Sequence, residues 1–286
     1  MTAGAADSRP SVTSGLRGRG GALRRRVSGP LGLGIATLWL SLIVLLPLAA
    51  IAVKSFDGGW SAFWSVVTSS AALDALRITV LVSLLVALIN VVMGTIIAWV
   101  LVRDDFPGKR IVNALIDLPF ALPTIVASLV LLSLYGPNSP IDIKLNATQP
   151  ALVIALAFVT LPFVVRQVQP VLIEVDQSVE EAAASLGARN SVIWWKVVFP
   201  SLAPAVLSGA GLAFTRAIGE FGSVVLIGGN IPGHTQVASQ LIQQQIEQDS
   251  NQGAAAISLV LLIIAFLALF VLRAVARRST SREENA

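Results

Sequence analysis

Six long apolar runs divide this chain and limit what it can fold into. They occupy residues 31–53, 78–102, 111–134, 151–165, 201–227 and 254–272. A transmembrane α-helix needs about 20 apolar residues, because each residue rises about 1.5 Å and the hydrocarbon core is about 30 Å thick. Inside a bilayer the backbone N–H and C=O groups must pair within the protein, which favours helices for such runs. The sequence therefore predicts an all-α, polytopic membrane protein of six transmembrane helices.

Composition agrees with this prediction and excludes other classes. The chain of 286 residues is 55% hydrophobic and 13% charged, too apolar for an ordinary soluble domain. A formal net charge of +4 could indicate nucleic-acid binding, but the few aromatic residues do not interleave with the basic ones. Cysteine is absent, which excludes disulfides and thiolate chemistry.

The runs and their flanks divide the chain into four predicted segments. Residues 1–30 are rich in Gly, Ser and Arg without a hydrophobic period, and we expect a disordered basic cytoplasmic tail. Residues 31–76 hold the first transmembrane helix and an outer loop, 77–273 the main transmembrane domain, and 274–286 a cytoplasmic C-terminal tail. The first run is longer than the ~7–15 apolar residues of a signal peptide, so we expect it to stay uncleaved.

The distribution of Lys and Arg predicts the orientation. With the N-terminus inside, six spans place the tail, the turn 103–110, the stretch 178–200 and the C-terminus on the cytoplasmic side, and these hold nearly all basic residues. The outer loops hold only Lys54, Arg77 and Lys144. This is the asymmetry of the positive-inside rule, and both termini are therefore predicted to be cytoplasmic.

The stretch 178–200, which we call the docking element, is a polar island among the apolar runs. Ser178 and Glu181 have the spacing of a capping box at a helix start, and Gly187 suits a left-handed helix end. Asn190 or Ser191 could cap a second short helix, and Pro200 fits the first turn of the next one. One face of the first helix is apolar at helical spacing: Val175, Val179, Ala182, Ala183 and Leu186. A surface for a partner protein is one interpretation; an amphipathic hairpin lying on the membrane is the other.

These residues resemble the EAA loop of bacterial ABC-type importer permeases. The family pattern is EAA, three residues, G, nine residues, then I-x-L-P, and only two apolar positions differ here, with Val197 for Ile and Phe199 for Leu. The matching residues are Glu181, Ala182, Ala183, Gly187, Val197, Phe199 and Pro200. In that family the loop is the coupling helix, which docks in a groove of the ATP-hydrolysing subunit.

The resemblance also implies a fold and an assembly. It implies the type I importer transmembrane fold, working with two copies of an ATP-binding subunit, a second homologous permease subunit and an extracytoplasmic sulfate-binding protein. It places the chain in the plasma membrane of a bacterium. It implies that this chain needs no cofactor of its own, since ATP and Mg would bind to the partner subunit.

No catalytic motif stands out in the sequence. It has no G-x-x-x-x-G-K-[ST] phosphate loop, no G-x-S-x-G nucleophile motif, and a single histidine, His234, which cannot form a two-histidine metal site. We therefore predict no catalytic residues and no metal site, and a transport role for the bundle. A self-powered secondary transporter or channel is the contrasting class, but neither ionisable relays in several spans nor an inverted repeat is evident.

Arg216 and Glu220 are ionisable residues within the fifth apolar run. At a spacing of four they would share one helix face and pair. In one interpretation they neutralise each other, or helix neighbours such as Asp117, and fix helix packing. In the other they line a translocation path with Gly219 and Gly222, and Arg216 contacts an anionic substrate.

Three segments narrow the substrate by resemblance. Residues 100–110, 117–136 and 212–233 are similar to the sulfate/thiosulfate branch of these permeases, and specifically to its T-type subunit. Molybdate and tungstate permeases share the A-x-G-E-F-G pattern of residues 217–222 and are the nearest alternative. The resemblance thus implies a permease subunit of an importer for sulfate and thiosulfate.

Overall fold

The computed structural model describes residues 30–283. The tail predicted at residues 1–30 lies outside the described residues except for Pro30, and the last three residues of the predicted C-terminal tail lie outside as well. Every regular element among residues 30–283 is helical, which confirms the predicted all-α class. The chain forms two compact units, Met1–Ala50 and Ile51–Ala286, so the boundary falls within the first predicted transmembrane helix.

The first unit contains one apolar helix. It consists of α1 (Pro30–Leu40), a π-helical turn η1 (Ser41–Leu45) and the beginning of α2 (Leu46–Ser55), which continues into the second unit. Residues Gly32–Ser55 have a mean hydropathy of 2.4 and are long enough to span a bilayer.

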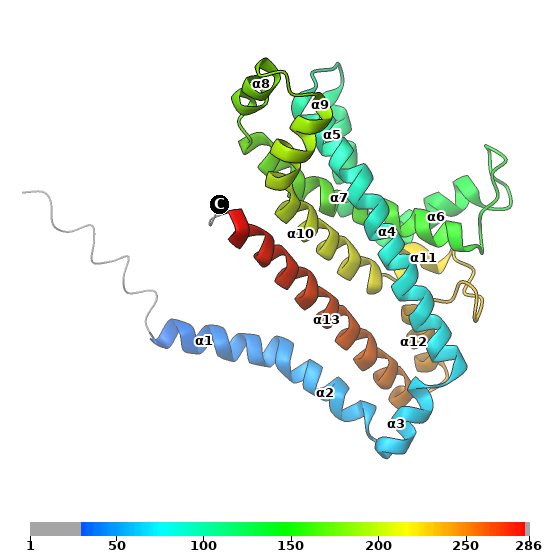
Figure 1. Cartoon of the computed structure of the whole chain (residues 1–286). Coiled ribbons are helices and arrows are strands. Elements are labelled where there is room, and N and C mark those ends of the chain that lie inside the picture. Colours follow the sequence, from blue (N-terminus) through cyan, green and yellow to red (C-terminus); the bar gives the residue numbers. More distant parts are fainter. Residues whose placement is uncertain (1–29, 284–286) are drawn as a thin grey trace, which may run out of the picture. The chain divides into compact units, whose positions relative to one another are not determined.

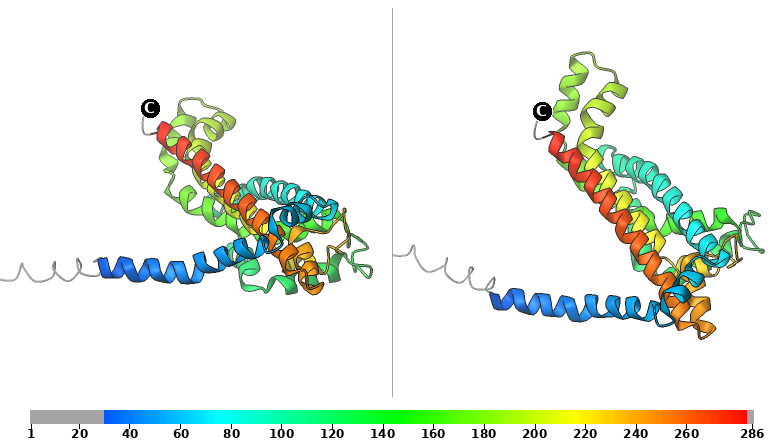
Figure 2. Two further views of the ribbon diagram at one scale, coloured as in Figure 1. Left: turned by 90° about the horizontal axis from the view of Figure 1, so that it is seen from below. Right: turned by 60° about the horizontal axis from the view of Figure 1, so that its bottom comes forward.

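The second unit is a bundle of long helices with short ones at both ends (Figure 1). Its long helices are α4 (Ser70–Arg103), α7 (Gln149–Glu174), α10 (Phe199–Ile218) and α13 (Asn251–Glu283). The shorter elements are α3 (Gly59–Val67), α5 (Lys109–Ala121), α6 (Thr124–Tyr135), α8 (Gln177–Ser185), α9 (Asn190–Ile193), the π-helical η2 (Trp194–Val198), α11 (Gly222–Val225) and α12 (Ala238–Glu247). The turn formed by α8 and α9 lies at the opposite end of this unit from α3 and α12 (Figures 1 and 2).

The core of the second unit lies between α4, α7 and α10. These helices pack pairwise, and α13 packs against α10. One apolar cluster joins Val86 of α4 to Leu152 and Ala155 of α7, and a second joins Val168 of α7 to Leu202 of α10. In a water-soluble protein, burying each of these side chains would stabilise the fold by roughly 1.5–3 kcal/mol. Lipid is as apolar as leucine, so here the side chains stabilise the bundle mainly through close packing.

Six spans are present if one bent pair is counted as a single span. Among the described residues, five helices are long and apolar enough to cross a bilayer: Gly32–Ser55, Ser70–Arg103, Gln149–Glu174, Asn190–Ile218 and Asn251–Leu272. The pair α5 and α6 meets the same criteria together, but the two helices meet at 114°. The apolar run at 111–134 therefore consists of two helices joined at a sharp bend. Proline explains the break, because Pro123 has no N–H to donate and holds Leu122 in an extended conformation (ψ 134°).

The predicted helix over 201–227 is also interrupted. It begins earlier, at Asn190, and α10 ends at Ile218 with Gly219 as its C-cap. The next helix, α11, begins at Gly222. Glycine at the helix end and the non-helical Phe221 (φ −120°, ψ −51°) account for the interruption.

The two interruptions are close in space, because α6 and α11 pack against each other. The Ser128 hydroxyl oxygen of α6 accepts hydrogen bonds from the N–H groups of Leu226 (3.1 Å) and Ile227 (3.2 Å), just beyond α11. Gly222 allows this approach, because a Cβ there would lie 2.1 Å from Oγ1 of Thr124 and 3.0 Å from the backbone N of Ile125. The broken helices thus supply each other with polar partners, as membrane proteins require.

Replacing Gly222 with alanine should therefore destabilise the protein. The added methyl group must push α11 away from α6, and overpacking of this kind costs about 1–3 kcal/mol. Thermal unfolding of the purified protein in detergent measures the effect. Gly219→Ala is the matched control, because a Cβ there meets no atom within 4 Å and φ is −90°. Equal unfolding temperatures for the two variants would contradict the close approach.

Candidate functional site

The docking element begins with a helix capped by an aspartate. Asp176 is the N-cap of α8, and its Oδ1 accepts a hydrogen bond from the backbone N–H of Ser178 at 2.9 Å. The predicted capping box of Ser178 and Glu181 is wrong, because the helix begins at Gln177 and Ser178 already lies in its first turn. The bond from the Ser178 backbone, and then one from its side chain, lowers the pKa of Asp176 below the usual 3.8. At neutral pH the cap is therefore an anion at the positive end of the helix.

Gly187 ends α8 as predicted. Its φ of +84° is left-handed, a conformation that glycine adopts without strain. The N–H of Gly187 donates to the Ala184 carbonyl (2.9 Å) and the N–H of Ala188 to the Ala183 carbonyl (3.1 Å). This pair of bonds is a Schellman motif, which satisfies the last carbonyls of α8 and turns the chain sharply.

Beyond the bend the helix is continuous. α9 begins after Arg189 with no side-chain cap, so the predicted capping by Asn190 or Ser191 is wrong. α9, η2 and α10 follow one another without a gap, so no separate second helix ends before Pro200. The N–H of Phe199 bonds to the Trp194 carbonyl, five residues back, which forms a π turn. This wider turn precedes Pro200, whose ring would crowd the preceding carbonyls of a regular α-helix.

The residues of the predicted EAA pattern fall into two groups. Glu181, Ala182 and Gly187 are exposed and Ala183 is half-buried, since α8 has no buried residue. Leu186 is 89% exposed and Val179 51%. The second group, Val197, Phe199 and Pro200, is half-buried in η2 and the first turn of α10. The first group therefore forms an exposed surface with apolar side chains, and the second joins that surface to the bundle.

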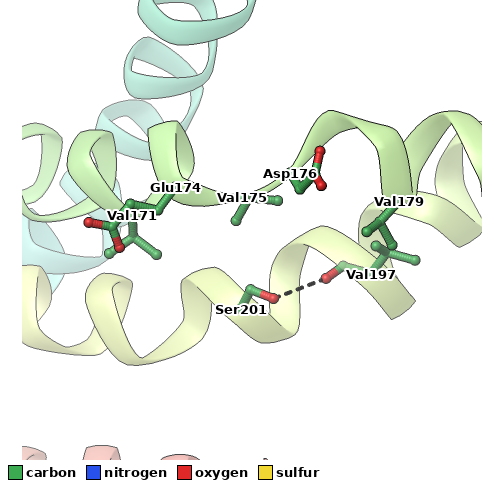
Figure 3. A pocket seen from close by; sticks show the side chains of 7 residues that line it. All are labelled: Val171, Glu174, Val175, Asp176, Val179, Val197 and Ser201. Carbon is green, nitrogen blue, oxygen red and sulfur yellow. Dashed lines mark hydrogen bonds between the residues drawn. The ribbon is translucent and has the colours of Figure 1, made fainter. Parts of the chain in front are cut away.

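A cleft of about 310 Å³ lies between the α7–α8 connection and the start of α10 (Figure 3). Val171, Val175 and Val179 line it from one side, and Val197 and Ser201 from the other. Val179 and Val197 lie at the same end of the cleft (Figure 3). Two carboxylates of the connection, Glu174 and Asp176, also line it. The cleft thus extends the exposed surface of α8 towards the bundle.

Arg216 and Glu220 form the predicted ion pair. Glu220 lies beyond the end of α10, so the prediction that one helix carries both residues is wrong although the pairing is right. The Glu220 side chain is 2% exposed, and its Oε1 accepts the N–H of Ser223 in α11 at 2.9 Å. Arg216 is 36% exposed. Glu220 therefore has a structural role as the N-terminal partner of α11, and a contact of Arg216 with substrate stays a prediction.

Asp117 pairs with Arg166 of α7, and not with Arg216 or Glu220. The two Arg166–Asp117 bonds measure 2.7 and 2.6 Å, and the guanidinium also bonds to Asn113 (2.9 Å) and Gln169 (2.6 Å). This cluster fixes α5 to α7. Sequence reasoning missed it because Asp117 and Arg166 are 49 positions apart in different apolar runs, with no spacing that links them.

Sequence reasoning also missed Arg103. It forms an ion pair of 2.5 Å with Glu180 of α8 and joins the end of α4 to the docking element. A basic residue at the end of a span is expected on topology alone, so the sequence gives no signal for a specific partner.

Comparisons with known proteins place the chain in a family. Residues 90–281 match the family described as binding-protein-dependent transport system inner membrane component. The chain belongs to this family. The matched range includes the docking element and the Arg216–Glu220 pair. Members are membrane components of transport systems and not enzymes, and the apolar helices agree with a multi-pass inner membrane permease.

Two curated relatives are both named sulfate transport system permease protein CysT. The one from Synechocystis sp. is 43% identical over 83% of this chain and 86% of its own length. The one from Escherichia coli K12 is 42% identical over 84% of this chain and 89% of its own length. Both relatives align along most of their length.

Solved structures support the fold. A bacterial ABC transporter that imports the acidic polysaccharide alginate has a chain with a TM-score of 0.72, at 15% identity over 87% of this chain and 94% of that one. A chain of the methionine ABC transporter MetNI, in an inward-facing conformation, has a TM-score of 0.57 at 18% identity and covers 72% of this chain and 95% of its own length. The type I importer transmembrane fold expected from the sequence is therefore confirmed.

The burial of Glu220 leads to a prediction. Arg216→Gln should destabilise the permease, because it leaves a buried carboxylate without its cationic partner, at a cost of about 1–3 kcal/mol. The double variant Arg216→Gln/Glu220→Gln should be less destabilised than this single variant, since a neutral amide at position 220 removes the unpaired charge. Thermal unfolding in detergent measures both. Additive losses in the double variant would contradict the pairing.

Proposed function

We propose that the chain is the membrane-spanning permease subunit of an ATP-driven importer that translocates sulfate, and also thiosulfate, across the cytoplasmic membrane. The observation that most directly supports sulfate as the substrate is the 42–43% sequence identity to two CysT proteins over more than four fifths of each chain. A substrate shared with those relatives would be a small oxyanion that this chain neither hydrolyses nor modifies.

The proposed partners follow from the docking element and the family. Two copies of an ATP-binding subunit hold ATP and Mg, and one of them seats α8 in a groove. A second homologous permease completes the passage, and an extracytoplasmic sulfate-binding protein delivers the anion. The alginate transporter has been solved in complex with a periplasmic protein bound to alginate pentasaccharide. By analogy, this supports an extracytoplasmic binding protein as a partner.

Two features support docking by α8. A short helix whose C-cap residue, Leu186, is 89% exposed leaves apolar surface for a partner to bury. The positive-inside pattern favours a cytoplasmic location for α8, both termini and the turn at 103–110, where ATP is available. The position of α3 and α12 at the far end of the second unit agrees with an extracytoplasmic location for those two helices (Figure 1).

The proposed mechanism is mechanical. ATP-driven closure of the ATP-binding subunits displaces α8, and the Gly187 bend passes the displacement into the continuous helix from Asn190 to Ile218. At its far end this helix meets the interruption at Gly219 and the pair Arg216–Glu220. A rigid-body shift of the helix would thereby rearrange the region where α6 and α11 meet, and so alternate access to the passage.

Uptake measurements test the substrate. In a strain lacking its own sulfate permeases, expression of this chain with its partner subunits should restore uptake of labelled sulfate, and excess thiosulfate should compete. Competition by molybdate or tungstate but not by thiosulfate would favour the alternative oxyanion permease. Uptake that persists without any ATP-binding subunit would favour a self-powered secondary transporter.

A substitution at Leu186 tests docking. Leu186→Asp places a charge at the exposed C-cap of α8 and should abolish both co-purification of the ATP-binding subunit and uptake. Membrane insertion should persist, because Leu186 is 89% exposed and lies outside the core clusters of the bundle. Leu186→Met is the matched control, since it keeps the apolar volume. Normal co-purification of the Asp variant would refute docking by this surface.

A further inference from the structure

Arg103 is the last residue of α4, and its side chain lies where α4 meets the docking element. Its Nη2 donates to Oε1 of Glu180 in α8 at 2.5 Å and to the carbonyl oxygen of Val175 at 3.3 Å. Val175 is the C-cap of α7 and precedes α8. The guanidinium carbon also lies 5.6 Å from the centroid of the Trp99 ring, one turn earlier on α4. One side chain therefore contacts α8, the α7–α8 connection and its own helix.

The contact continues beyond the Gly187 bend. Trp99 meets Trp194, the first residue of η2, in an edge-to-face arrangement with ring centroids 4.9 Å apart. Aromatic pairs favour this geometry because the edge of one ring is positive and the face of the other negative. Both segments that flank the bend are thus held to the last two turns of α4, one by an ion pair and the other by tryptophans.

The Arg103–Glu180 pair is unusual within α8. The two side chains are 10% and 20% exposed, whereas most of α8 faces solvent. It is the one ion pair of α8 among the residues that the structure describes. Arginine suits the position, because its planar group can stack beside an aromatic ring while it donates to a carboxylate. Since α8 buries no residue, this pair supplies its strongest directed contact with the bundle.

α4 connects this contact to the far end of the second unit. Its 34 residues rise about 50 Å from Ser70 to Arg103. Near its beginning, the Thr79 hydroxyl oxygen accepts the N–H of Ala238, the first residue of α12, at 2.7 Å. A helix this long, packed against α7 and α10, moves largely as a rigid body. A force on Glu180 can therefore reach α12 without passing through α10.

We propose that Arg103 is a positioning residue that couples displacement of the docking element to α4. The Arg103–Glu180 pair gives α8 a non-covalent connection to α4, in addition to its chain connections to α7 and to the continuous helix α9–η2–α10. It sets how much transport results from each ATP hydrolysed, and it does not bind the ATP-binding subunit. This inference rests on the proposed function, since it requires α8 to be the site at which force is applied.

The test uses the complete transporter in proteoliposomes, with both permeases, the ATP-binding subunits and the sulfate-binding protein. Arg103→Gln and Glu180→Gln are each compared with the wild type, and the measured quantity is sulfate transported per ATP hydrolysed. We expect both variants to assemble and hydrolyse ATP, with this ratio reduced about fivefold or more, the size of moderate coupling between linked sites. The double variant should be no worse than the poorer single variant, because the pair acts as a unit.

Arg110→Gln is the matched control. Arg110 lies in the turn 103–110, which is predicted to be cytoplasmic like α8, is exposed, and forms no ion pair with any residue in the described part of the chain. Its substitution should leave the ratio unchanged.

Three results would overturn the proposal: an unchanged ratio in Arg103→Gln, additive losses in the double variant, or failure of both single variants to assemble, which would make the contact purely structural. A wild-type transporter that fails to retain its ATP-binding subunit, or to move sulfate, would instead refute the proposed function.

Discussion

Backbone hydrogen bonding inside the bilayer is the constraint on which the rest of this structure depends. Lipid offers no partner for an N–H or C=O group, so each apolar run must be helical and each interruption must find polar partners within the protein. In residues 30–283 the runs are interrupted at Leu122–Pro123 and at Gly219–Phe221, and these two places pack together through α6 and α11. Ser128 and Glu220 accept N–H groups there that a continuous helix would have satisfied. These two breaks thus lie together in the bundle.

The helix α8 lies outside the candidate spans, so this constraint does not apply to it. α8 can expose its apolar side chains, end at a left-handed glycine and depend on an aspartate cap, none of which would suit a span. Its connections to the bundle are correspondingly specific. They are the short chain connection to α7, the continuous helix through η2 into α10, and the contact of Glu180 with Arg103. A surface that is free on one side and firmly connected on the other is suited to transmitting force.

Much of the fold could be predicted from the sequence, because long apolar runs leave few alternatives in a membrane. The Gly187 bend was also predictable, since only glycine adopts its φ of +84° without strain. The helix interruptions were harder to place. Proline is tolerated within the helices α7 and α10 yet ends a helix at Pro123, so its effect depends on neighbours that the sequence does not identify.

The polar contacts depend even more on tertiary structure. Asp117 pairs with Arg166, and Arg103 with Glu180, across separations of 49 and 77 positions. The Arg216–Glu220 pair could be predicted because a separation of four keeps the residues near each other whether or not the helix continues. The EAA pattern identified the surface of α8 but not its attachment, since that depends on side chains outside the pattern.

The central claim is that α8 meets an ATP-hydrolysing partner on the cytoplasmic side, and the absence of cysteine makes it directly measurable. A single Leu186→Cys substitution in the assembled transporter provides one thiol in this chain for a membrane-impermeant maleimide. The account predicts labelling in inside-out vesicles stripped of the ATP-binding subunit, protection when that subunit is restored, and no labelling in right-side-out vesicles. Labelling from the outer face, or equal labelling with and without the subunit, would contradict it.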